Sequence, residues 1–158
     1  MARAHRSYRI LLTCLLVGCC CAGCGDNSPR VRIAGREWNV EVADDNATRS
    51  KGLAGRKEVP EGTGMLFVFG GEQVLDFHML NCHVPLDVAF ISARGTVVHV
   101  RTMKVEADPA NPTAVYSSKW PAQFAIEVAA GSLEKAGVKV GDRAEFMGSA
   151  RDAAKGAR

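Results

Sequence analysis

The chain has 158 residues, of which 47% are hydrophobic and 23% are charged. These values suit one globular domain and exclude a wholly disordered, collagen-like or coiled-coil protein. The formal net charge is +3, and Arg3, Arg6 and Arg9 account for it, because no acidic residue precedes Asp26. The rest of the chain is formally neutral, so we expect no nucleic-acid partner.

Residues 1–18 are predicted to be a secretory signal peptide. Residues 1–9 carry the positive charges, and residues 10–18 are apolar and uncharged, which is the order found in such peptides. The apolar stretch is shorter than the roughly 20 residues that a membrane-spanning helix needs. We therefore expect an exported protein that is not integral to the membrane.

The signal peptide ends in a motif that resembles the lipobox of bacterial lipoproteins, Leu16-Val17-Gly18-Cys19. The resemblance implies that Cys19, or as a second choice Cys24, carries the lipid, and that residues 19–30 tether the domain to a membrane. The expected location is the cell envelope, on the periplasmic face of a membrane. Because no Asp follows either cysteine, the outer membrane is slightly favoured. The expected partners are the membrane, through the anchor, and a small molecule or an envelope protein.

Residues 31–148 are predicted to form a single β-rich domain. Alternating apolar residues over 31–43 indicate a hairpin that turns at 34–36. Further strands are expected at 65–69, 73–81, 88–92, 96–103, 123–129 and 138–146, and short helical segments from Asp44 or Asp45 to about residue 53 and over 131–136. Three prolines predict a long loop over 104–122, and residues 149–158 are expected to be a flexible tail. The predicted fold is mostly β (α+β), a compact barrel-like sheet of about seven strands with one or two short helices.

Several ordered motifs in the body resemble one known family. They are Arg49-x-x-Gly52-Leu53-x-x-Arg56, then Gly64 to Phe69, Phe77-x-Met79-x-Asn81-x-x-Val84-Pro85-Leu86-Asp87, Tyr116-x-Ser118, Ile126-Glu127-Val128 and Gly141-Asp142. Over residues 32–147 this order resembles the uncharacterised bacterial and archaeal family known as domain of unknown function 192. The resemblance implies a small β-rich, barrel-like domain with a helix, and it carries no established activity.

Three positions depart from the pattern of that family. Ala54 stands where the family usually has Met, His78 where it usually has Trp, and Cys82 where it usually has Thr. Chemistry that depends on His78 or Cys82 would therefore not be shared by the family as a whole.

The closely spaced His78, Cys82 and His83 are weak candidates for a metal or thiol site. In an extended strand, residues four apart lie about 13 Å apart, and His83 would point to the opposite face. The spacing of Cys21 and Cys24 is also that of metal ligands, but no histidine lies nearby and the segment is better explained by lipid attachment. We predict no metal and no cofactor, and Cys82 has no partner for a disulfide within the body.

Asp87 heads the candidate polar cluster because it follows Pro85-Leu86 at the start of an apolar strand. A buried carboxylate needs a cation or several hydrogen-bond donors. The expected partners and neighbours of Asp87 are Arg49, Arg56, Asn81 and Glu127. Such a cluster could line a binding pocket, act in catalysis or hold a strand and a helix in register, and we favour the structural role.

The sequence contains no phosphate-binding loop, nucleophile elbow, zinc-protease motif or dinucleotide fingerprint, and catalytic residues are unknown. The first hypothesis is a non-enzymatic, lipid-anchored envelope domain that binds a small ligand or a protein. The alternative is an envelope hydrolase that uses Asp87 with Arg56 or Glu127. Convergence of these residues in an open concavity would favour the enzyme, whereas a closed and paired Asp87 would count against it.

Overall fold

The computed structural model describes residues 26–157. The predicted signal peptide and both candidate lipidation sites, Cys19 and Cys24, lie outside the described residues. Within the described part of the chain, no helix combines the length and apolar character needed to cross a membrane.

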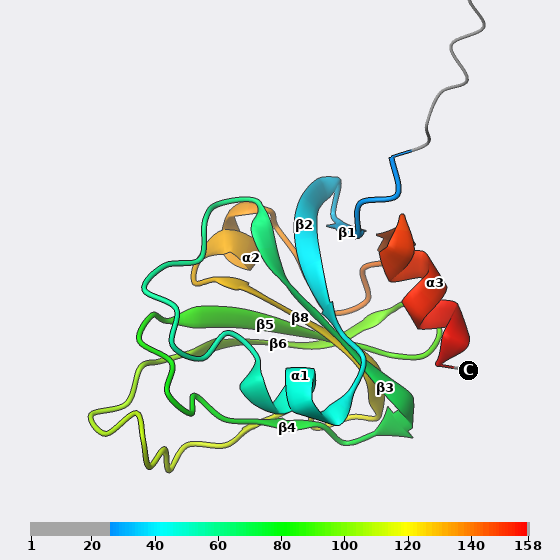
Figure 1. Ribbon diagram of the computed structural model, residues 1–158. Helices are drawn as coiled ribbons and strands as arrows, with labels where there is room; N and C mark the ends of the chain where they lie inside the picture. The colour runs from blue at the N-terminus through cyan, green and yellow to red at the C-terminus, as the bar shows by residue number, and fades with distance from the viewer. Residues whose placement is uncertain (1–25, 158) are drawn as a thin grey trace, which may run out of the picture.

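Seven strands form one sheet in the order β6-β5-β8-β3-β2-β1-β9, and two shorter strands, β4 and β7, form a separate ribbon (Figure 1). Three short helices complete the fold. The elements are β1 (Arg30–Ile33), β2 (Arg36–Ala43), α1 (Asn46–Lys51), β3 (Thr63–Gln73), β4 (Asp76–Phe77), β5 (Leu86–Ile91), β6 (Val97–Met103), β7 (Tyr116–Ser117), β8 (Ala122–Ala129), α2 (Ser132–Lys135), β9 (Ala144–Met147) and α3 (Ser149–Gly156).

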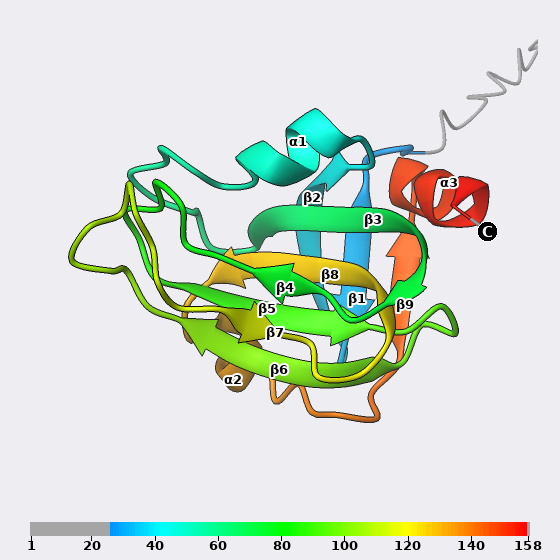
Figure 2. The same cartoon turned by 90° about the horizontal axis from the view of Figure 1, so that it is seen from below.

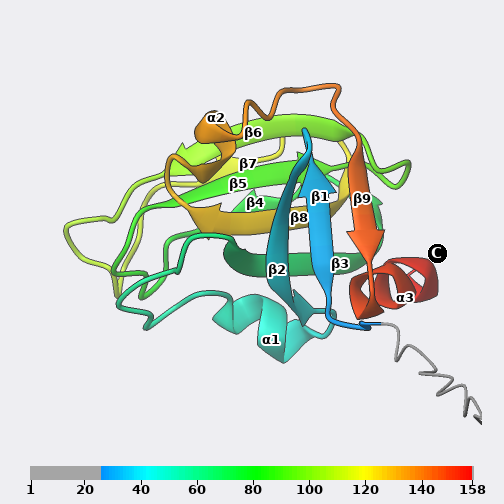
Figure 3. The same ribbon diagram turned by 90° about the horizontal axis from the view of Figure 1, so that it is seen from above.

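The large sheet curls into a half-barrel. Figure 3 shows β1, β2 and β9 crossing over the part of the sheet that contains β5, β6 and β8. An isolated bridge between Thr96 and Arg143 joins the segment before β6 to the segment before β9. The backbone N–H of Val97 also donates to the carbonyl of Asp142 at 2.9 Å. The predicted mostly-β, barrel-like fold is therefore confirmed, with three short helices in place of one or two.

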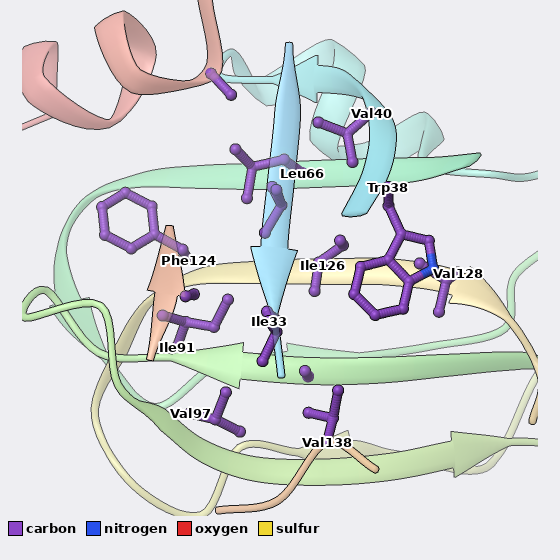
Figure 4. Close-up of a cluster of buried hydrophobic side chains, with 14 of the residues drawn as sticks. Ile33, Trp38, Val40, Leu66, Ile91, Val97, Phe124, Ile126, Val128 and Val138 are labelled. Atoms are coloured by element: carbon purple, nitrogen blue, oxygen red, sulfur yellow. The ribbon is translucent and has the colours of Figure 1, made fainter. Parts of the chain in front are cut away.

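The inner face of the half-barrel holds the first of two hydrophobic clusters (Figure 4). Alternate residues of each strand point into it, as the period of a β-strand requires. The side chains labelled in Figure 4 are Ile33, Trp38, Val40, Leu66, Ile91, Val97, Phe124, Ile126, Val128 and Val138. The two halves of the curled sheet thus bury their apolar sides against each other.

The second hydrophobic cluster lies on the outer face of the same sheet, beneath the β4–β7 ribbon and the segment that follows α1. Figure 2 shows β4 and β7 in front of β5 and β8. The ring of Phe77 on β4 contacts Phe67 on β3 with centroids 5.0 Å apart and Phe90 on β5 at 5.3 Å. The sequence predicts a strand over 73–81. In the structure Gln73 ends β3 and pairs with Ala122, whereas β4 consists of Asp76 and Phe77 alone, because its partner is the short β7.

Residues 149–156 form a packed helix, so the prediction of a flexible tail at 149–158 is wrong for most of its length. Ala150 and Ala154 of α3 are buried in the inner cluster. The side-chain amide of Gln123 on β8 donates to the carbonyl of Ala157 at 2.6 Å. The apolar stripe of this helix consists of alanines, and such a stripe is hard to distinguish from the small residues of a disordered tail.

Candidate functional site

Glu127 is placed on the outer face of the sheet by the alternation of β8. Its neighbours Ile126 and Val128 point into the inner cluster, so the Glu127 side chain points the opposite way. Glu127 pairs with Met65 on β3 and with Val88 on β5, both of which belong to the outer cluster. The Glu127 side chain therefore lies between apolar residues on the outer face of the sheet, and the residue is only 5% exposed.

Gly64 allows β3 to lie close to the backbone of β8 beside this residue. A Cβ atom at Gly64 would fall 2.3 Å from the carbonyl oxygen of Glu127 and 2.9 Å from a methyl group of Val128. Because the first of these atoms belongs to the backbone, a side chain at this position would force the two strands apart. The glycine thereby helps to fix the strand that carries Glu127.

The carboxyl group of Glu127 has no hydrogen-bond or ion-pair partner among residues 26–157. Burial away from water disfavours its charged form and raises the pKa of Glu127 to about 8. The group is therefore largely protonated at neutral pH, when it can both donate and accept a hydrogen bond. In the described chain the fully buried side-chain atoms without a partner are Arg30 Nε and His99 Nε2, so the Glu127 oxygens keep some contact with solvent. A buried acid with such an opening and a raised pKa is a candidate for function.

A pocket of about 460 Å³ opens over Glu127. Its walls come from α1 and the residues after it, from β3, and from β4 and the segment that follows; Figure 1 shows α1 and β4 on the same side of the sheet. The lining residues are Asn46, Arg49, Ser50, Lys51, Gly52, Leu53, Phe67, Phe69, Asp76, Phe77, His78, Leu80, Cys82 and Glu127. The size is that of pockets that hold small organic molecules.

The pocket has an apolar interior and a charged rim. Leu53, Phe67 and Phe77 are buried around Glu127, whereas Lys51 is exposed. Glu127 therefore lies among the buried residues of the pocket and Lys51 among its exposed ones.

Arg49 anchors the helical side of the rim. Its guanidinium donates to the carbonyls of Asp44 at 2.7 Å and Val68 at 2.6 Å and to the side chain of Asn46 at 2.5 Å. It also lies over the ring of Phe69, 5.2 Å from the centroid. Arg49 thus fastens α1 to β3, and it makes no ion pair with Asp87.

The three weak metal candidates do not converge. His78 and Cys82 both line the pocket, but His83 is exposed and does not. In the part of the chain that the structure describes, no group of three or more His, Cys, Asp or Glu side chains could hold a metal ion. Burial, and then the nearby Glu127 carboxylate, raise the pKa of the Cys82 thiol to about 11. The thiol is therefore a poor nucleophile at neutral pH.

Asp87 does not belong to the pocket, although sequence analysis places it at the head of a polar cluster. It shares the inner face of β5 with Ala89 and Ile91, opposite to the face of Glu127. Its carboxylate accepts hydrogen bonds from the Thr102 hydroxyl at 2.8 Å and from the backbone N–H of Leu133, in the first turn of α2, at 3.1 Å. Asp87 is 2% exposed and joins β5, β6 and α2, which is the structural role that we favoured.

Arg56 and Asn81 are also separate from Asp87. Arg56 forms an ion pair with Glu41 on β2 at 2.7 Å, on the surface. Asn81 acts through its backbone, which adopts φ of +53°. Its backbone N–H donates to the carbonyl of Pro109 at 2.7 Å, and its carbonyl accepts from the backbone N–H of Gly55 at 2.8 Å. The proposed cluster of five residues therefore divides into a pocket with Arg49 and Glu127 and three structural positions elsewhere.

Two aromatic residues of the pocket belong to the hydrophobic core as well. Phe67 and Phe77 do pack in the outer cluster, but each also lines the pocket. The available signal was Glu127 itself, an acidic residue between Ile126 and Val128 in an otherwise apolar strand. Because both faces of β8 are covered, an acidic residue there had to be buried.

Comparisons with known proteins identify the family of the domain and similar solved structures. The profile of a family described as an uncharacterized ACR, DUF192, matches residues 30–146. A crystal structure from Sinorhizobium meliloti 1021, described as a candidate transcription regulator, is 34% identical with a TM-score of 0.66, covering 75% of this chain and 92% of its own. A crystal structure of a protein of unknown function from Novosphingobium aromaticivorans DSM 12444 is 27% identical with a TM-score of 0.64, and the match covers 73% of this chain and 83% of that chain. No curated protein matches the chain.

Proposed function

Since this chain belongs to the DUF192 family, which carries no assigned activity, we propose from its pocket that it binds a small ligand. From the lipobox-like motif at residues 16–19 we also propose that it belongs to the cell envelope and is attached to a membrane through lipid on Cys19. One observation carries the binding function. The buried carboxyl group of Glu127 has no partner among the described residues and lies in a 460 Å³ pocket. A ligand that pairs with this group would offset the unfavourable burial.

The closed surroundings of Asp87 favour binding over the hydrolase alternative. A hydrolase would need Asp87 beside Arg56 or Glu127 in one open site, whereas Asp87 is buried with Thr102 and Leu133 on the other face of the sheet. The high pKa of Cys82 also supports a pocket that binds without a cysteine nucleophile.

A thermal-melt screen of the full chain against envelope metabolites tests the binding function. A ligand at 100 times its Kd adds about 2.7 kcal/mol, which should raise the Tm by roughly 5 °C or more. Glu127→Ala should remove that increase, while the matched control Glu145→Gln, at an exposed site on β9, should retain it. An increase that Glu127→Ala leaves intact, or no increase with any compound, would contradict the proposal.

Membrane fractionation tests the anchor separately. Cys19→Ala should release the protein from membranes or leave the signal peptide uncleaved, because the acyl chains can no longer be attached. Cys20→Ala, one position further on, is the matched control and should fractionate like the wild type. If Cys19→Ala is processed and retained normally, the anchor lies at Cys24 or does not exist.

A further inference from the structure

The buried end of the pocket lacks a positive charge that would match its carboxyl group. Glu127 is 5% exposed, and no basic side chain contributes to the shift of its pKa, which burial alone causes. Both basic side chains of the pocket, Arg49 and Lys51, are in α1 at the rim, and the guanidinium of Arg49 already bonds to α1 and β3. A buried carboxylate is stabilised most strongly by a cation.

The aromatic walls also suit a cation that carries an apolar body. The rings of Phe67 and Phe77 meet edge to face, 5.0 Å apart, and both line the pocket together with Leu53. The face of an aromatic ring attracts an ammonium group, and the attraction is stronger away from water. The same rings provide apolar surface for the rest of such a ligand.

The charged rim argues against a bare metal ion as the occupant. Arg49 and Lys51 are opposed there by one carboxylate, Asp76, beside His78, and the described residues contain no metal-binding group. A cation carried on an apolar body recovers free energy from the aromatic walls that an ion cannot. An anionic group at the far end of the ligand would lie near the basic residues of α1.

From this arrangement we infer that the pocket binds a small organic amine, whose ammonium group pairs with Glu127 and whose apolar body lies against Phe67 and Phe77. The inference rests on the proposed binding function and specifies its ligand class. At a pH where Glu127 is ionised, a ligand that reaches it with an anion is disfavoured, since two negative groups would then share one buried site.

Three probes with the same aromatic ring separate the charge of the head group from the fit of the body. They are 2-phenylethylamine, 2-phenylethanol and phenylacetate, each titrated into the ¹⁵N-labelled full chain and followed by NMR. We expect the amine to bind at least tenfold more tightly than either of the others and to shift the amide signals of residues that line the pocket. Glu127→Gln should abolish this preference, and Glu145→Gln should leave it unchanged.

The pH dependence gives a second readout. An ammonium group pairs with the ionised carboxylate, so affinity for the amine should rise about tenfold per pH unit below pH 8. The other titratable or charged groups facing the pocket are Cys82, His78, Asp76, Arg49 and Lys51. Glu145→Gln, which removes an exposed carboxylate of β9 outside the pocket, is the matched control and should keep the same profile.

The outcomes distinguish this inference from the proposed function. Equal or tighter binding of the alcohol or the acid at the pocket would overturn the amine as ligand class and leave the binding function standing. Amine binding that is unchanged in Glu127→Gln would overturn the pairing with Glu127. If no probe shifts a signal from the pocket, the inference fails, and the metabolite screen decides the binding function independently.

Discussion

Asp87 on β5 and Glu127 on β8 are buried acidic residues on neighbouring strands, one position out of register. Asp87 points to the inner face of the sheet and accepts two hydrogen bonds from residues of β6 and α2. Glu127 points to the outer face, has no such partner in the described chain, and opens into a pocket. The difference shows that burial of a carboxyl group does not by itself indicate function. The hydrogen-bond partners of the carboxyl group determine its role, since a carboxylate with partners stabilises the fold and one without partners is available to a ligand.

The largest expected effect is the pH dependence of stability that Glu127 causes. Near pH 4 the carboxyl group is mostly protonated in the folded and unfolded chains alike. As the pH rises from about 4.5 to 8, the unfolded chain loses this proton while the folded chain keeps it, so stability falls. The loss of stability above pH 8 is on the order of 5 kcal/mol. Glu127→Gln should remove it.

Urea unfolding at pH 5 and pH 9 measures this contribution. The stability advantage of Glu127→Gln over the wild type should grow with pH, and comparison with Glu145→Gln accounts for an exposed carboxylate. If the wild type and Glu127→Gln change in parallel between the two pH values, Glu127 does not carry the raised pKa and the contrast with Asp87 fails.

Asp87→Ala should reduce the free energy of unfolding by about 3 kcal/mol, because it leaves the buried N–H of Leu133 without an acceptor and removes the bond from Thr102. Thr102→Val removes one of the two bonds and should cost about 1 kcal/mol. Urea unfolding of each variant at pH 7 measures both changes. An Asp87→Ala variant that is fully stable but does not bind ligand would instead place Asp87 in the functional site.

Arg49→Ala should cost about 1.5 kcal/mol, because Arg49 holds α1 to β3 through the carbonyl of Val68. Loss of this contact should also speed hydrogen exchange of the amides in α1, which forms one wall of the pocket. Lys51→Ala, at an exposed position of the same helix, is the matched control and should exchange like the wild type. Equal exchange in the two variants would show that Arg49 does not position the wall.

Arg56→Ala should change the free energy of unfolding by less than about 0.5 kcal/mol, because its ion pair with Glu41 is exposed. Glu41→Ala should have a similarly small effect. If Arg56→Ala instead destabilises the protein as strongly as Asp87→Ala, Arg56 contributes to the buried carboxylate after all, and the assignment of Asp87 to Thr102 and Leu133 is incomplete.

The fold could be predicted where residues alternate clearly. The hairpin of β1 and β2 and the N-cap of α1 at Asp45 follow from local patterns, and the structure has both. The β4–β7 ribbon could not be predicted, because Phe77 and Tyr116 pair across a long segment of the chain. Short strands that depend on distant partners leave little local signal.

The candidate site could be predicted in part. The sequence singles out Glu127 and Arg49, and both line the pocket. Their grouping with Asp87 was wrong, because Asp87 lies out of register with Glu127 and so faces the other side of the sheet. The face of a side chain depends on strand pairing and on a period of two residues, and the pairing of β5 with β8 is not encoded locally.

The most direct test of the central claim is a ¹³C NMR titration of the Glu127 carboxyl group in the full chain, with and without saturating 2-phenylethylamine. The account predicts a pKa of about 8 in the free protein that falls by about 2 units or more when the ammonium group pairs with the carboxylate. A pKa near 4.5, or a raised value that the amine leaves unchanged, would contradict it.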